Sequence, residues 1–184
     1  GLKAYDQVRM LLNRCDHVIV LVRAGLDDAE LPLPEWRARY RRFIDAGASV
    51  VADTGAAKGW ETYKNGLVFY GLGQPNEHDS LLLSLNLRQN GKLDYEARAL
   101  ELAAGESRFS ANGAFKKKID GQNRLYLDEA AYLRAADEMC LRYYRENEHP
   151  QKHGIFNGLL TGKTDALRQD EDRLFDLLGN ESRR

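Results

Sequence analysis

Apolar positions in the first fifty residues follow two patterns, one helical and one typical of strands. Across residues 2–14 they recur at three- and four-residue spacing, which predicts an amphipathic helix. Residues 17–22 form a short β-branched run, which predicts a fully buried strand. A second helix is predicted to begin at Pro34 and stop at Gly47, and residues 49–52 predict a second buried strand. This order predicts a right-handed parallel crossover unit.

The middle of the chain changes to the alternating pattern of strands. Residues 61–63 and 67–72 flank an Asn-Gly turn, which predicts a β-hairpin. Residues 80–87 and 93–102 predict two further antiparallel strands, with a turn over residues 89–92. The predicted fold class is therefore a mixed α/β or α+β layered arrangement, with a parallel βα unit followed by antiparallel strands.

The last third is predicted to be helical after a connecting loop. Residues 105–122 contain few apolar positions, which indicates an exposed connection, and Asp128 can cap the helix that follows. A final helix is predicted from Thr164 or Asp165 to Gly179. The apolar face of the first of these helices is predicted to comprise Leu133, Ala136, Cys140, Tyr143 and Tyr144.

Composition narrows the class of protein. A length of 184 residues fits one domain, or one domain with an appendage, and 43% hydrophobic residues can form a real core. A net charge near −1 argues against a generic polyanion-binding surface, and no nucleic-acid partner is predicted. No apolar run approaches the ~20 residues of a membrane span, and no signal peptide is visible. Cys15 and Cys140 are expected to be buried thiols rather than a disulfide.

Charged residues follow the predicted strands at the edge where ligands bind in α/β folds. Arg23 and Asp27 follow the first strand, and Asp53 ends the second. The rest of the loop over residues 53–58 offers little that could carry out chemistry. One interpretation is a polar pocket that binds an anionic or sugar-like ligand through Arg23. The other is a structural ion pair together with an aspartate that caps its own loop. The sequence leaves both open.

Five ordered segments together resemble a known family. They are DHVIV at 16–20, RAGLD at 23–27, IDAGA at 44–48, GWETY at 59–63 and FYGLGQ at 69–74. Their order and spacing resemble the CapA-type capsule and poly-gamma-glutamate synthesis proteins, which have a calcineurin-like metallophosphoesterase fold. In that family a buried strand ends in His-Trp-Gly-x-Glu, the helix that follows ends in Asp-Ala-Gly-Ala-Asp, and the next strand ends in Gly-His-His-Pro/Thr-His. A tyrosine-containing hairpin and the segment Tyr-Ser-Leu-Gly-Asn come after it.

This chain departs from the family at the metal-binding positions. Arg23 stands where the family has its first histidine, Asp27 where it has a glutamate, and Gln74 where it has an asparagine. The three histidine positions of the second motif hold Thr54, Gly55 and Ala57. Such sites need imidazoles and carboxylates around a divalent ion. We therefore predict neither a metal nor another cofactor, and no catalytic residue. The ligand-binding candidates are Arg23, Asp27, Asp53, Thr54 and Gln74.

The resemblance also implies how the chain is organised. Residues 1–110 would be the carboxyl-terminal part of a CapA-like domain, and residues 111–184 a connecting loop with a helical extension packed on it. The amino-terminal half of the family domain, which carries further metal ligands, is missing. Half of a layered sandwich exposes one sheet face, so we expect either a piece that folds alone or a homodimer that buries this face.

Three functions follow from these patterns. The first is a non-catalytic family member that binds or scaffolds an anionic polymer or sugar in cell-envelope polymer synthesis. The second is a metal-dependent phosphoesterase or hydrolase with ligands from the missing half, and the third is a protein-interaction module. The cell envelope is suggested by the resemblance alone, because the residues themselves do not indicate a compartment.

Overall fold

The computed structural model describes residues 4–75, 79–88, 92–103, 105–109 and 113–146. The chain divides into two compact units, Gly1–Met139 and Cys140–Arg184. The domain boundary that the resemblance implies after residue 110 stays a prediction. The elements run in the order α1 (Ala4–Leu11), β1 (Ile19–Val22), α2 (Pro34–Asp45), β2 (Val50–Asp53), β3 (Trp60–Tyr63), β4 (Gly66–Phe69), β5 (Ser80–Leu87), β6 (Leu93–Ala103), β7 (Glu106–Phe109), α3 (Ala114–Tyr126) and α4 (Glu129–Glu146).

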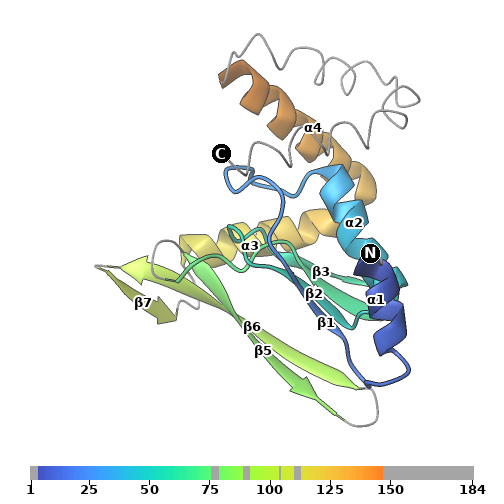
Figure 1. Cartoon of the computed structure of the whole chain (residues 1–184). Helices are drawn as coiled ribbons and strands as arrows, with labels where there is room; N and C mark the ends of the chain where they lie inside the picture. The colour runs from blue at the N-terminus through green and yellow to red at the C-terminus, as the bar shows by residue number, and fades with distance from the viewer. Residues whose placement is uncertain (1–3, 76–78, 89–91, 104, 110–112, 147–184) are drawn as a thin grey trace, which may run out of the picture. The chain divides into compact units, whose positions relative to one another are not determined.

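The first sheet has four strands in the order β1-β2-β4-β3. Figure 1 labels β1, β2 and β3 of this sheet. Strands β1, β2 and β4 are parallel, and β3 runs antiparallel to β4. Both the parallel crossover through α2 and the hairpin that precedes residue 70 are therefore confirmed. Helix α2 begins at Pro34 as predicted, and Gly47, at φ 109°, follows its end.

The core of the first unit lies between this sheet and the elements on its two faces. Val50, Val51, Val68 and Phe69 on the central strands β2 and β4 are all 0% exposed. Residues of α2 pack on one face, and Leu83, Leu85, Leu93 and Ala97 of the second sheet pack on the other. The result is the layered, mixed α/β arrangement that the apolar pattern predicts.

Strand β1 differs from the sequence prediction. It is an edge strand rather than a fully buried one, and Ile19 is 41% and Leu21 69% exposed. A continuous apolar run is typical of a central parallel strand, but the same run can stand at an edge. Its burial depends on which elements flank it, and the run itself does not contain that information.

The second sheet is antiparallel, in the order β5-β6-β7. Strands β5 and β6 are confirmed, whereas the prediction of an exposed connection over residues 105–122 is wrong. That stretch contains β7 and most of α3, a helix that buries Phe115, Ile119 and Tyr126. The three apolar residues are four and seven positions apart, a helical spacing. The lysines at positions 116–118 lower the local hydrophobicity and obscure that spacing.

Helix α4 has the predicted cap but a different buried face. The backbone N–H of Ala131 donates to Asp128 Oδ1 at 3.0 Å. The buried face consists of Tyr132, Ala136 and Met139, while Leu133 is 40% exposed. The predicted burial of Ala136 is therefore confirmed, whereas Tyr132 is buried in place of its neighbour Leu133. In the described ranges, no helix is both long enough and apolar enough to cross a membrane.

The two cysteines are free, as predicted, but Cys15 is exposed and Cys140 only half-buried. Helix α1 ends at Leu11, so Cys15 follows the helix instead of lying on its apolar face. The predicted buried thiol at position 15 is therefore wrong. The predictions of a final helix and of a loop that contains His149 and His153 fall outside the described residues.

Candidate functional site

Three loops meet at the edge of the first sheet where the parallel strands end. The first follows β1, the second follows β2, and the third follows β4. The backbone N–H of Thr54 donates to Val22 O at 2.9 Å, and that of Leu72 donates to Asp53 O at 2.8 Å. These bonds continue the pairing of the strands beyond their ends, so the loops begin side by side. In open α/β sheets this edge is where ligands bind.

Asp53 ties the second loop to helix α2. Its side chain is buried, its Oδ1 accepts from the backbone N–H of Gly55 at 2.6 Å, and its Oδ2 accepts from the Tyr40 hydroxyl. Burial raises the pKa of Tyr40, and the hydrogen bond to Asp53 raises it further, so the hydroxyl stays protonated as a donor. Asp53 therefore caps its loop, as one of the two sequence interpretations states.

Arg23 and Asp27 tie the first loop to the second. Arg23 Nη2 donates to Asp27 Oδ2 at 2.9 Å, and Arg23 Nη1 donates to Thr54 O at 3.1 Å. Asp27 Oδ1 accepts from the backbone N–H of Ala56 at 3.1 Å. Both charged side chains are half-exposed, at 52% and 54%. The pair thus bridges two loops and still faces solvent.

The third loop lies directly on the second at Gly71. A Cβ at this position would lie 1.8 Å from Ala56 O, and φ is +154°, so only glycine fits. Gly73 N donates to Gly55 O at 2.8 Å, and Gln74 follows. The structure therefore brings Arg23, Asp27, Asp53 and Thr54 into one network, and places Gln74 just beyond the contact of the third loop.

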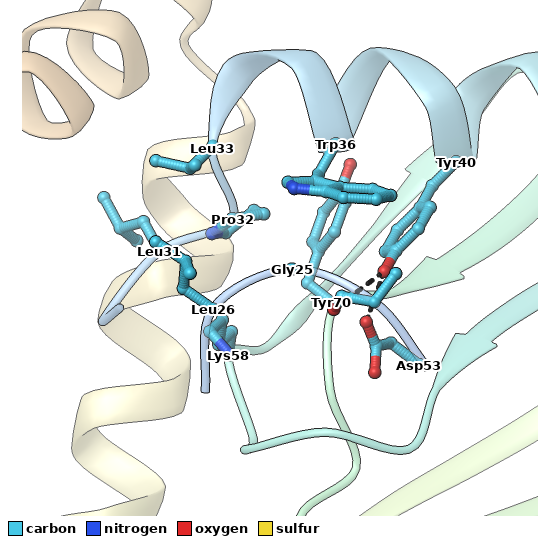
Figure 2. A pocket seen from close by; sticks show the side chains of 11 residues that line it. Gly25, Leu26, Leu31, Pro32, Leu33, Trp36, Tyr40, Asp53, Lys58 and Tyr70 are labelled. Atoms are coloured by element: carbon cyan, nitrogen blue, oxygen red, sulfur yellow. Dashed lines mark hydrogen bonds between the residues drawn. The ribbon is translucent and has the colours of Figure 1, made fainter. Parts of the chain in front are cut away.

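Sequence reasoning missed Lys58, which contradicts the expectation that the second loop offers little chemistry. Lys58 is 6% exposed and lines a small pocket with Asp53, Tyr40, Tyr70 and Trp36 (Figure 2). Its Nζ donates to Ala56 O at 3.2 Å. Burial lowers the pKa of Lys58, although the carboxylates of Asp53 and Asp27 oppose this shift. A single lysine among small residues carries no sequence signal for burial.

A buried ion network lies behind the pocket. Arg37, 1% exposed, donates through Nη2 to Glu61 Oε2 at 2.7 Å, and Arg41 Nε donates to Glu61 Oε1 at 2.7 Å. Burial raises the pKa of Glu61, but hydrogen bonds from Arg41, Arg37 and Tyr70 outweigh it and leave the pKa below its ordinary value. Tyr70, which lines the pocket, donates its hydroxyl to Glu61. The network therefore fixes one wall of the pocket.

The residues at the loop edge do not fit the divalent ions that the family resemblance implies. A side chain at position 55 would begin 2.6 Å from Asp27 Oδ1, so the position of one family histidine is filled. The oxygens of Asp27 already accept from Arg23 and Ala56, and the guanidinium supplies the positive charge there. In the part of the chain that the structure describes, no three His, Cys, Asp or Glu residues converge as metal ligands.

Comparison with known proteins supports the resemblance. Residues 3–75 match the family model described as bacterial capsule synthesis protein PGA_cap. The match ends at the third loop, so it spans all the residues of the loop network and of the pocket. A search among curated proteins found no relative that matches the chain.

Proposed function

Because residues 3–75 match the model of the bacterial capsule synthesis protein family PGA_cap, we propose that the chain is a non-catalytic member of that family. It binds or scaffolds a polymer in capsule or poly-gamma-glutamate synthesis at the cell envelope. Its contact site is the loop edge of the first sheet, with Arg23, Asp27, Asp53, Thr54 and Gln74 as the ligand-binding candidates.

The observation that carries this proposal is that the Arg23–Asp27 ion pair stands half-exposed at the loop edge. A guanidinium is always charged and presents its donors in a planar fork that suits carboxylates and other oxyanions. Arg23 holds this fork at the loop edge, half-exposed, where the family pattern has a metal ligand. A fixed cation in that position favours binding of an acidic group over binding of a metal ion.

The test is to replace Arg23 by alanine and measure polymer binding by calorimetry at low salt. Poly-gamma-glutamate and an acidic polysaccharide such as alginate serve as probes. We expect binding to weaken about tenfold, because a charge-assisted contact is worth roughly 1.5–3 kcal/mol. The free energy of unfolding should change by about 1 kcal/mol or less, because the Arg23–Asp27 pair is exposed.

Arg9→Ala is the matched control, because Arg9 forms a similar exposed pair with Asp6 on α1, away from the loop edge. If Arg23→Ala binds the polymer as well as the unmodified chain and only its stability is reduced, the Arg23–Asp27 pair has a purely structural role.

The enzymatic alternative is tested on the same preparation. Near-stoichiometric manganese, iron or zinc together with hydrolysis of a generic phosphate ester would refute the non-catalytic assignment.

A further inference from the structure

The pocket beneath Trp36 is lined by the ammonium group of Lys58, which uses one of its three donors on the residues that the structure describes. Only 6% of the Lys58 surface is exposed to solvent. Its ammonium group can donate three hydrogen bonds. Within the described ranges, its Nζ makes one hydrogen bond, to Ala56 O at 3.2 Å. Asp53 attracts this ammonium, but its own oxygens accept from Gly55 and Tyr40. A buried donor without an acceptor is costly, so an acceptor that enters the pocket gains a strong partner.

The size of the pocket decides which acceptor can enter. Its volume is about 10 Å³, the lower limit for one water molecule. A hydroxyl group, with one non-hydrogen atom, is of that size, whereas a carboxylate or a phosphate is several atoms larger. The pocket therefore selects a single small polar group.

The charge of the pocket points to the same group. Lys58 and Asp53 line it together, so its wall carries a cation and an anion. An anionic ligand would be attracted by one and repelled by the other. A hydroxyl is neutral, and it can accept from an ammonium as well as donate to a carboxylate.

One wall of the pocket is aromatic. Trp36 lies on α2, with its ring centroid 6.3 Å from that of Tyr40, and Tyr40 stacks on Tyr70 at 5.9 Å. Figure 2 shows the indole of Trp36 over the pocket, next to these two rings. Aromatic walls with a few fixed polar groups are typical of small-ligand sites. Tyr40 and Tyr70 are only 3% and 2% exposed, whereas Trp36 is partly exposed, with the Arg39 guanidinium 5.1 Å from its ring centroid. The apolar C–H face of a sugar ring can therefore pack on the indole of Trp36 while its hydroxyl points inward.

We propose that this pocket is a subsite for a sugar hydroxyl, with Lys58 as its donor and Trp36 as its platform. The inference rests on the proposed function and sharpens it. It assigns the ligand to hydroxyl-bearing polysaccharides, rather than to polymers such as poly-gamma-glutamate that offer carboxylates without hydroxyls. Arg23 and Lys58 then contact different groups of one ligand.

The test uses the indole N–H signals of Trp36 and Trp60 in the ¹⁵N-labelled chain, assigned with Trp60→Phe. Methyl glucoside and methyl galactoside are titrated, with glutarate as the carboxylate comparator. We expect at least one glycoside to shift the Trp36 signal saturably, and glutarate to leave it unchanged. Lys58→Met should weaken the binding about tenfold or more. Lys64→Met, a change at an exposed lysine on the hairpin turn, should leave it intact.

A Trp36 signal that neither glycoside moves, or that responds equally in Lys58→Met, would overturn the inference. If Lys58→Met does not give a folded spectrum, Trp36→Leu measured by calorimetry replaces it, and unchanged glycoside affinity there has the same meaning. The polymer experiment separates the two proposals. Arg23-dependent polymer binding without any glycoside effect removes the subsite alone, whereas a glycoside effect without polymer binding removes the proposed function alone.

Discussion

Arg37 is a charged residue whose role is structural. Its guanidinium donates to Glu61, to Glu129 Oε2 at 3.0 Å and to Tyr126 O at 2.9 Å, and it lies 4.1 Å from the ring centroid of Tyr132. These contacts join α2, β3, α3 and α4 at one point. An arginine fits this position because its planar fork can satisfy several acceptors at once.

We expect Arg37→Ala to lower the free energy of unfolding by about 3 to 5 kcal/mol, because it leaves Glu61 buried with fewer partners. Urea unfolding followed by circular dichroism measures this loss. Arg42→Ala, an exposed change on the same helix, should stay within about 0.5 kcal/mol of the wild type. Equal losses in the two variants would contradict the structural role of Arg37.

Gly71 gives a second prediction at the level of single residues. Gly71→Ala forces a Cβ to within 1.8 Å of Ala56 O at a φ of +154°. We expect a loss of about 2 kcal/mol or more, together with weaker polymer binding, because the second and third loops must separate. In Gly121→Ala, on α3, the new Cβ meets nothing within 4 Å. This control should gain about 0.5–1 kcal/mol from helix propensity, and a similar gain for Gly71→Ala would refute the loop contact.

The site could be predicted from sequence only where backbone topology determines it. Arg23, Asp27, Asp53 and Thr54 converge because parallel strands end at one edge, and the sequence predicts those strands. Lys58 and the Arg37–Glu61 pair could not be found in the same way. Lysine, arginine and glutamate are usually exposed, and here each is buried by elements far away in the chain, among them α3 and α4.

Strand β1 gives a prediction at the level of elements. Among the described strands it pairs with β2 alone, and it exposes the side chains of Ile19 and Leu21, with no charged residue or proline within the strand. Such an edge favours pairing with another strand. We propose that two copies of the chain pair through the edge strand β1. This dimer differs from the one expected from the sequence, which would bury a sheet face, because elements of the same unit pack on both faces of the first sheet.

Light scattering after gel filtration tests this dimer. Leu21→Lys should shift the mass from dimer to monomer, with a change in stability within about 0.5 kcal/mol because Leu21 is 69% exposed. Leu127→Lys makes the same change at an exposed leucine beyond α3 and should leave the dimer intact. A monomeric mass for the unmodified chain would refute the proposal.

Elements were predictable where their apolar period is clear. The hairpin of β3 and β4 and the pair β5–β6 follow from alternation and turn residues. Helix α3 was missed because three successive lysines interrupt its apolar face, and its burial comes from contacts made across the fold. Asn123 Oδ1, for example, accepts the backbone N–H of Trp60 at the start of β3, at 2.8 Å. Contacts at such sequence separation leave no local signal.

For the whole molecule, the buried network of Arg37, Arg41 and Glu61 makes the free energy of unfolding depend on pH in the acid range. The pKa of Glu61 in the folded state lies below its ordinary value of 4.5. Above that value the carboxylate contributes its full stabilisation, and this contribution is lost as the pH falls through the folded-state pKa. We expect thermal melting temperatures to fall steeply below about pH 4.5. Glu61→Gln should be less stable near pH 7 but flatter in the acid range, and parallel pH profiles would contradict this origin.

The exposed thiol of Cys15 lies four positions before β1. It can be labelled chemically without changing the sequence. Cys140, half-buried, should react more slowly with maleimides. A spin label attached at Cys15 would therefore report on the neighbourhood of β1 from the outside. When two chains that each carry a label at Cys15 pair along β1, the distance between the two labels reports how the strands are aligned. No substitution in the chain is needed for this measurement.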